Sequence, residues 1–227
     1  MCGIVGIFIK NKKLESNLGN YLSKMIDNMS SRGPDSAGFA IYDSLRNKKL
    51  CKFSLCLSDN VNINHFIKDI KKNFKNIKTK QLDDHLVITT SSKIENFKKF
   101  INDKYKDVSI VGYGHSIEIF KQVGSPKNIV KKFQLHKFKG THGIGHTRMA
   151  TESAITTNGS HPYSTGADEC LVHNGSLSNH NNLRRILIKN GKKFYSENDT
   201  EVAAGYISSK LQEKFSLKET LKNTLKD

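Results

Sequence analysis

Residues 1–8 read MCGIVGIF, an apolar run that directly follows a cysteine at position 2. The isoleucines, the valine and the phenylalanine predict a short buried strand, and the two glycines leave room around the backbone. Such a strand would hold Cys2 rigidly at its start. The alternative is an ordinary core strand that happens to begin with Met-Cys, and eight residues alone do not decide between the two.

Cys2 has the chemistry of a nucleophile that carries its own base. Removal of Met1 leaves a free α-amine on Cys2, and a terminal amine has a pKa of roughly 7.7–8.0, which suits a general base near neutral pH. A free thiol of pKa about 8.5 is mostly protonated at pH 7, so an adjacent base increases the reactive thiolate fraction. No distant histidine is required for this chemistry.

The composition limits the class of protein. A chain of 227 residues fits one large domain, or one domain with an inserted lobe. No apolar run approaches the roughly 18 residues of a membrane span and no signal peptide is evident, so we expect a cytoplasmic protein without a membrane partner. The four cysteines form no C-x-x-C pair, so we expect free thiols and no metal site.

The formal charge of +16 suggests a polyanionic partner. Most of the basic residues are lysines spread over 10–13, 68–80 and 98–106, without one dense block. Aromatic residues are not interleaved with them as a single-strand binder would require. A basic nucleic-acid-binding module is therefore kept only as an alternative to a solvated lysine-rich surface.

The chain continues with a helix, a turn and a strand. Apolar residues at spacings of three and four predict a helix over 14–30. Residues 30–43, SSRGPDSAGFAIYD, contain a strong Gly-Pro-Asp turn signal and then resume a strand. Arg32 at the start of this turn is either functional or a surface ion-pair residue.

From residue 50 the sequence becomes richer in charged residues, and this change predicts an inserted α/β lobe over 50–140. Short β-like runs alternate with lysine-rich amphipathic segments, and we find no phosphate loop or paired carboxylates in them. A structural or partner-docking role is the default. The predicted strands are 51–57, 85–90, 107–113 and 116–123, and the predicted helices lie near 63–75 and 93–103.

Residues 140–177 hold the densest group of polar and glycine residues. His142 and His146 have the four-residue spacing of helical metal ligands, but the glycines between them argue against a helix. Arg148 lies among small and β-branched residues, where a guanidinium needs a carboxylate, either of a ligand or of an internal ion pair. His161 before a proline is most simply a buried core histidine.

Asn174 and Gly175 follow an apolar run, and a side-chain amide beside a glycine N–H offers two donors to a developing oxyanion. Asn-Gly is also the commonest hairpin turn. Helices are predicted to follow from Ser178 or Asn179 to Gly191 and from 196 onward, with amphipathic segments at 204–215 and 217–225. Asp199 and Glu201 near a helix start can be simple caps.

Four separated motifs together resemble one family, the class II glutamine amidotransferases, which are N-terminal-nucleophile hydrolases. In order along the chain they are MCGIVGIF at 1–8, SRGPDSAG at 31–38, GHTRMAT at 145–151 with SHPY at 160–163, and HNG at 173–175 with NDTEV at 198–202. The resemblance covers both ends of the chain and leaves out 50–140.

The resemblance assigns the reacting groups. It implies that Cys2 attacks the side-chain amide of glutamine with its α-amine as base. Asn174 and the Gly175 N–H would form the oxyanion hole, and Arg32 looks like the family's arginine near the nucleophile.

The resemblance also assigns the substrate-binding groups. Arg148 would bind the α-carboxylate of glutamine and Asp199 its α-ammonium, which gives two charge-assisted anchors. Thr151 and His161 would support the pocket. No cofactor is implied.

The sequence also departs from the common pattern. Met149 stands where many relatives have an aromatic residue, and Glu152 where they have histidine. These runs are similar to the glutamate-synthase-related branch, which includes the amidotransferase subunit of N-methylglutamate synthase. Relatives continue with further sheet strands beyond the position of Asp227, so the resemblance implies C-terminal strands that are missing here or supplied by another polypeptide.

The resemblance implies an α+β fold over 1–227: a four-layer αββα sandwich with the inserted lobe. The expected activity is hydrolysis of glutamine to glutamate through a Cys2 thioester, with ammonia passed to a synthase subunit in a hetero-oligomer. The rivals are a non-catalytic subunit that binds glutamine or glutamate, and the nucleic-acid-binding module.

Overall fold

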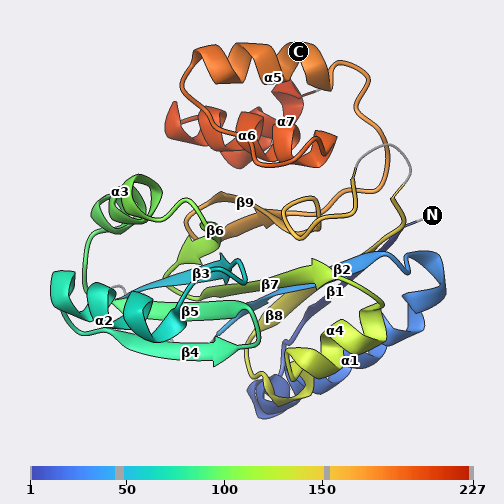
Figure 1. The fold of residues 1–227 in the computed structure, drawn as a ribbon. Helices are drawn as coiled ribbons and strands as arrows, with labels where there is room; N and C mark the ends of the chain where they lie inside the picture. The colour runs from blue at the N-terminus through green and yellow to red at the C-terminus, as the bar shows by residue number, and fades with distance from the viewer. Residues whose placement is uncertain (1, 44–48, 151–153, 225–227) are drawn as a thin grey trace.

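The computed structural model describes residues 2–43, 49–150 and 154–224, and it contains three antiparallel sheets with helices on their faces (Figure 1). The first sheet has the order β1-β8-β2-β7. Its strands are β1 (Gly3–Phe8), β2 (Ser36–Tyr42), β7 (Ile117–Val123) and β8 (His142–Arg148). The start of the chain therefore pairs with a strand far along the sequence, because the residues that follow Met1 pair with residues near 145.

One face of this sheet is covered by α1 (Leu18–Asn28) and α4 (Pro126–Lys132) (Figure 1). Leu22 and Ile26 of α1 are fully buried. A Cβ on Gly145 would lie 2.7 Å from Ile26 Cδ1, so a glycine is needed for this close helix–sheet packing. The helix predicted from residue 14 begins instead with a 3₁₀ segment, Lys12–Asn17, because Leu14 is 40% exposed and does not join the buried stripe.

The opposite face is covered by a two-stranded ribbon and then by helices. The ribbon is β9 (Tyr163–Gly166) and β10 (Glu169–Leu171). Beyond it lie α5 (His180–Lys189), α6 (Asp199–Gln212) and α7 (Leu217–Asn223) (Figure 1). Helices, sheet, ribbon and helices make four layers, which confirms the α+β, αββα architecture.

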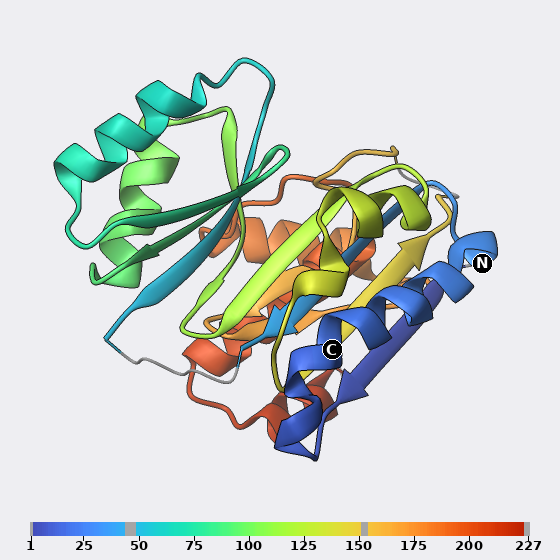
Figure 2. The ribbon, with the colours of Figure 1, turned by 90° about the horizontal axis from the view of Figure 1, so that it is seen from below.

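A separate unit, which we call the lobe (residues 51–114), stands beside the first sheet (Figure 2). Its sheet has the order β4-β5-β3-β6 and carries two helices. The apolar residues of this sheet and of the two helices form one hydrophobic core, which includes Phe53, Phe66 and Phe97. The elements are β3 (Cys51–Leu57), α2 (Ile63–Asn73), β4 (Lys78–Leu82), β5 (His85–Thr90), α3 (Ile94–Lys104) and β6 (Val108–Gly114).

The lobe is shorter than the predicted insert at 50–140, whose last strand was expected to belong to it. That strand, β7, pairs with β2 in the first sheet, and α4 packs beside α1. Ile117, Ile119 and Phe120 are all fully buried, so β7 is covered on both faces although it is the edge strand of the first sheet. Strand β4 was not predicted, because its exposed Lys-Thr-Lys sequence lacks the apolar alternation of a strand.

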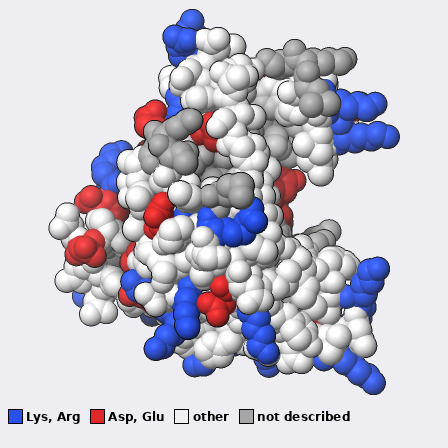
Figure 3. All heavy atoms as spheres, turned by 90° about the vertical axis from the view of Figure 1, so that its right-hand side faces the viewer, with Lys and Arg blue, Asp and Glu red and all other residues white. Residues whose placement is uncertain are grey.

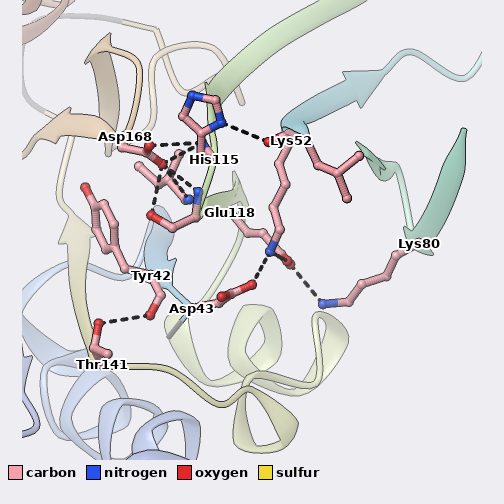
Figure 4. A network of polar contacts seen from close by, with 11 residues as sticks. Tyr42, Asp43, Lys52, Lys80, His115, Glu118, Thr141 and Asp168 are labelled. Atoms are coloured by element: carbon pink, nitrogen blue, oxygen red, sulfur yellow. Dashed lines mark hydrogen bonds and ion pairs between the residues drawn. The ribbon is translucent and has the colours of Figure 1, made fainter. Parts of the chain in front are cut away.

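Polar contacts join the lobe to the first sheet (Figure 4). Lys52 Nζ of β3 lies 2.6 Å from Asp43 Oδ2 and 2.9 Å from Glu118 Oε1 of β7, and Lys80 of β4 lies 3.0 Å from the other Glu118 oxygen. Burial raises the pKa of Glu118, but the two lysines outweigh it and hold that pKa below its usual range. Glu118 is therefore an ionised bridge between the two sheets.

A second polar contact ties the ribbon to the turn between β6 and β7. The Asp168 carboxylate accepts hydrogen bonds from the backbone N–H groups of His115, Ser116 and Ile117 at 2.7–3.1 Å (Figure 4). These bonds fix the ribbon over the first sheet, and the ribbon leads directly into the segment that carries Asn174 and Gly175.

Candidate active site

The register of β1 against β8 places Cys2 at the end of the first sheet. Gly3 pairs with Thr147, so Cys2 lies beside the residues that end β8. The backbone N–H of Met149 donates to Cys2 Sγ at 3.4 Å. A Cβ on Gly3 would lie 2.7 Å from Thr147 Oγ1 and 3.0 Å from Met29 Cβ. A glycine is therefore needed at position 3 for the backbone next to Cys2 to pack this closely against Thr147 and Met29.

Cys2 lines a pocket of about 480 Å³ between the end of β8, the segment that follows β10 and the start of α6. Five of the eight predicted site residues line it: Cys2, Arg148, His161, Gly175 and Asp199. Other lining residues were not predicted, among them Met149, His173, His180, Glu197, Asn198 and Thr200. Residues separated by nearly 200 positions in the sequence therefore share one cavity with the thiol.

Arg148 is the cationic group of this pocket. Its side chain is only 4% exposed, and Nη1 donates to the carbonyl of Ala154 at 3.2 Å. A guanidinium presents its N–H donors in a planar fork, a geometry that matches the two oxygens of a carboxylate. Arg148 is the last residue of β8, so the strand places it at the same end of the first sheet as Cys2.

Asp199 is the first residue of α6, which places its carboxylate at the positive end of the helix dipole. Asn198 caps the helix by accepting from the Thr200 N–H, and this cap fixes the direction in which Asp199 leaves the helix. Asp199 Oδ2 accepts from the Leu177 N–H at 2.7 Å. A carboxylate has about four lone-pair sites, so it can still accept hydrogen bonds from an ammonium group.

Asn174 and Arg32 contact the nucleophile residue through its carbonyl rather than through its thiol. Asn174 Nδ2 donates to the Cys2 oxygen at 3.2 Å, and Arg32 Nε donates to the same oxygen at 3.4 Å. The Asn174 amide also has a second N–H. Gly175 has φ +149°, and a Cβ there would lie 3.0 Å from His173 Nε2.

His161 is buried at the back of the pocket, where its ring stacks on His146 with 3.9 Å between centroids. Neither ring nitrogen of His161 has a hydrogen-bond partner among the described residues. Burial, reinforced by the charge of neighbouring groups, lowers the pKa of His161 well below its usual value. The imidazole is therefore neutral and acts as a flat wall, as expected for a core histidine.

Thr151, also predicted to support the pocket, lies outside the described residues. His142 and His146 lie in strand β8 rather than in a helix. Among the described residues one group, Cys56, Asp84 and His85, has the arrangement of metal ligands. Both Asp84 oxygens already have partners: His85 Nδ1 lies 2.7 Å from Oδ1, and Gln122 donates to Oδ2. Burial and Asp84 raise the pKa of Cys56 to about 12, so this thiol stays protonated.

Comparison with known proteins points to one kind of protein. Residues 133–212 match the model of the glutamine amidotransferase domain. The whole chain aligns with the glutamine amidotransferase-like protein GlxB of Rhizobium meliloti at 44% identity, over 76% of that protein. It also aligns with a putative glutamine amidotransferase of Methanothermobacter thermautotrophicus at 33% identity, over 78% of that protein.

More distant similarity extends to larger enzymes. A glutamine–fructose-6-phosphate aminotransferase of Francisella tularensis is 36% identical over 59% of this chain and 22% of its own length. The solved structure of an allosteric regulatory enzyme of purine biosynthesis superposes on the whole chain with a TM-score of 0.54 at 19% identity. The chain spans 33% of that structure, so this likeness supports the fold alone.

Proposed function

The chain belongs to the class II glutamine amidotransferases, and from this membership we propose that it hydrolyses glutamine to glutamate with Cys2 as nucleophile. One observation supports the proposal most: the Cys2 thiol shares a pocket with a buried cation, Arg148, and with a carboxylate, Asp199. Glutamine carries the complementary charges on its head group and an uncharged amide at its other end. A pocket with these three groups suits that molecule.

The proposed reaction has two steps. Cys2 Sγ attacks the amide carbon of glutamine, the C–N bond breaks, and ammonia leaves with the proton that the α-amine of Cys2 took from the thiol. Water then attacks the γ-glutamyl thioester, and glutamate leaves as the thiol is restored. The backbone of Met149 holds the sulfur in place: its N–H donates to Sγ at 3.4 Å, and its carbonyl oxygen lies 3.6 Å from Sγ.

In the proposed roles, Asn174 and the Gly175 N–H stabilise the negative oxygen of each tetrahedral intermediate. Arg32 holds the Cys2 carbonyl, which keeps the nucleophile residue in place. Arg148 and Asp199 fix the head group, which holds the amide near the thiol. The entropic cost of orienting the amide is then met on binding, and the activation free energy is lowered by that amount. His161 and Thr151 support the pocket wall.

The ammonia acceptor is proposed to be a synthase subunit related to glutamate synthase, in a hetero-oligomer. This rests on the similarity of residues 146–157 and 170–185 to that branch of the family. Such a partner would receive ammonia released at Cys2. A reconstitution in which glutamine-dependent synthesis needs both subunits would test this part of the proposal.

Basic charge is the feature that would favour nucleic acid instead. On the face shown in Figure 3, Lys and Arg side chains project singly or in small groups, with Asp and Glu between them. None of the described helices combines the length and apolar character needed to cross a bilayer. The dispersed charge on the face in Figure 3 adds no support to a polyanion-binding role.

The test is glutamate formation from glutamine by the purified chain, compared with Cys2→Ala and with Cys170→Ala. Cys170 is a matched control because burial raises its pKa to about 11, which keeps it protonated. We expect turnover by the parent and by the Cys170 variant, and none by Cys2→Ala, because no neighbouring group replaces the thiol. Glutamine binding without turnover by the parent would instead favour a non-catalytic binding subunit.

A further inference from the structure

His146 contacts the side chain of Asn174, the proposed oxyanion-hole residue, directly. It lies in β8, opposite Ile4 of β1 and Gly38 of β2. Its side chain is completely buried. Nε2 lies 2.9 Å from Asn174 Oδ1 and 3.1 Å from the carbonyl oxygen of His173. The ring therefore reaches from the first sheet to the segment that carries the oxyanion donors.

These contacts fix the tautomer of His146 and the orientation of Asn174 together. Both neighbours of Nε2 are oxygen acceptors, so Nε2 carries the proton. At the other end of Asn174, Nδ2 faces the Cys2 carbonyl, which is also only an acceptor. A flipped amide would place oxygen against oxygen at Cys2 and would lose the hydrogen bond at His146. The two contacts allow one orientation, with the amide N–H groups toward Cys2.

His146 is held so that it stays neutral. Its face stacks on His161, and its Nδ1 is buried with no partner among the described residues. Burial is the main cause that lowers the pKa of His146 to about 4, against the opposing effect of its hydrogen bond to Asn174. The same residue is not placed to be a base for Cys2, because it does not line the pocket and its proton-bearing nitrogen already faces Asn174 and His173.

Asn174 itself is exposed, so packing alone does not fix its amide. A reversed amide would present oxygen, rather than N–H, to the negative charge that develops on the substrate. Loss of one oxyanion-hole donor costs about 10²–10³ in kcat in enzymes where it has been measured. A contact that fixes the orientation of the Asn174 amide would therefore have a large effect on kcat.

We infer that His146 is a positioning residue that holds the Asn174 amide with its N–H groups toward Cys2 and so sets up the oxyanion hole. This inference rests on the proposed function for the role of Asn174. His146 touches neither substrate nor thiol and acts only through Asn174.

The experiment compares His146→Leu, which removes the donor, with His146→Gln, whose side-chain N–H can reach a similar position. We expect His146→Leu to lower kcat about 10- to 100-fold with little change in KM, because Arg148 and Asp199 still hold the head group. His146→Gln should recover much of kcat. In an Asn174→Ala background, His146→Leu should have no further effect, since its only route to the reaction is gone.

A second readout does not depend on turnover. In protein labelled with ¹⁵N at asparagine, the Asn174 side-chain amide protons should be shifted and protected from exchange in the parent. His146→Leu should collapse that signal toward the free-amide position, while thermal unfolding shows that the variant is folded. An unchanged Asn174 signal in a folded His146→Leu protein would overturn the inference, as would equal losses of kcat in both backgrounds.

Failure of the proposed function would appear differently. A parent without glutaminase activity would contradict the role of Cys2, whereas the Asn174 amide signal would still show whether His146 orients that side chain. If the signal depends on His146 in an inactive parent, the contact stands as structural and its catalytic meaning falls.

Discussion

The lobe and the region around Cys2 treat buried polar groups in opposite ways. In the lobe, the buried polar side chains Ser54, His85 and Thr90 each have a hydrogen-bond partner. Around Cys2, His146 Nδ1 and both nitrogens of His161 are buried without a partner among the described residues. An unsatisfied buried polar atom costs roughly 1–3 kcal/mol. The region around the thiol thus gives up stability to keep a polar pocket, and the lobe does not.

The core of the lobe should contribute to stability and not to catalysis. Phe97 is fully buried and stacks on Phe53 with 4.2 Å between ring centroids. Phe97→Ala should lower the free energy of unfolding by about 3–5 kcal/mol, because it removes a buried ring and leaves a cavity. Urea unfolding measures this loss. At low temperature, where the variant stays folded, kcat and KM for glutamine should match the parent.

A control for that prediction is Phe100→Ala on the same helix, where the ring is only partly buried and the loss should be smaller. A fall in kcat for the folded Phe97→Ala protein would break the comparison, because it would make the lobe part of the catalytic unit.

The buried histidines predict a pH dependence that belongs to the site region. The folded-state pKa of His146 is about 4, against a usual value of 6.5, and burial is the main cause. The unfolded chain therefore binds protons first as the pH falls, so stability is full above about pH 6.5 and is lost toward pH 4. His146 alone should cost roughly 2 kcal/mol between pH 7 and pH 5, and His161 acts in the same direction.

Urea unfolding at several pH values checks this dependence, with His161→Phe as the matched variant. The variant should show a shallower loss of stability with acid, because one proton-binding group of the unfolded chain is gone. An equal slope in parent and variant would mean that His161 is not buried and neutral in solution.

The sequence predicted much of this region, and particular residues show the limit. Cys2, Arg148 and Asp199 were assigned from ordered motifs, and they line one pocket because β1 pairs with β8 and α6 begins at Asp199. The role of Met149 was missed, since its contact with Cys2 comes from a backbone N–H, which no side-chain pattern reveals. His146 was considered only as a metal ligand. The alternation of His142, Ile144 and His146 on one face of a strand is the signal that would have directed attention inward.

In the lobe, the sequence did not predict where the lobe ends along the chain. Apolar runs located β3, β5, β6 and the two helices, but pairing partners are long-range and a run does not state its own sheet. β7 was therefore expected in the lobe, whereas its register with β2 places it in the first sheet. The role of Thr151, which lies outside the described residues, remains a prediction.

The charged anchors give a smaller expected effect than the lobe core. Arg148→Lys keeps the charge but loses the planar fork, so glutamine should lose about 1–3 kcal/mol of binding in the transition state. The measurement compares kcat/KM for glutamine and for 4-aminobutanamide, which lacks the α-carboxylate. The parent should discriminate strongly against the second compound, and Arg148→Lys should lose much of that discrimination.

Asp199→Asn is the companion change, since it keeps the shape and removes the charge that faces the ammonium group. Asp199→Asn should weaken the binding of glutamine and leave the preference for substrates with an α-carboxylate intact. Equal discrimination by the parent and by Arg148→Lys would instead make Arg148 an internal ion-pair residue.

The smallest expected effect is binding of nucleic acid. Dispersed lysines should give weak affinity that falls steeply with added salt, because the binding depends on counterion release. Fluorescence anisotropy with labelled single-stranded and duplex DNA measures this affinity. Tight binding at physiological salt that distinguishes sequences would restore the nucleic-acid-binding alternative.

The most direct measurement is covalent labelling of the intact protein with a glutamine-mimicking diazoketone, followed by mass spectrometry. We expect a chain that lacks Met1 and carries one adduct, on Cys2, with labelling slowed by glutamine and absent in Cys2→Ala. A folded protein that retains Met1, or takes its adduct at another cysteine at a rate that glutamine does not change, would contradict the central role of Cys2.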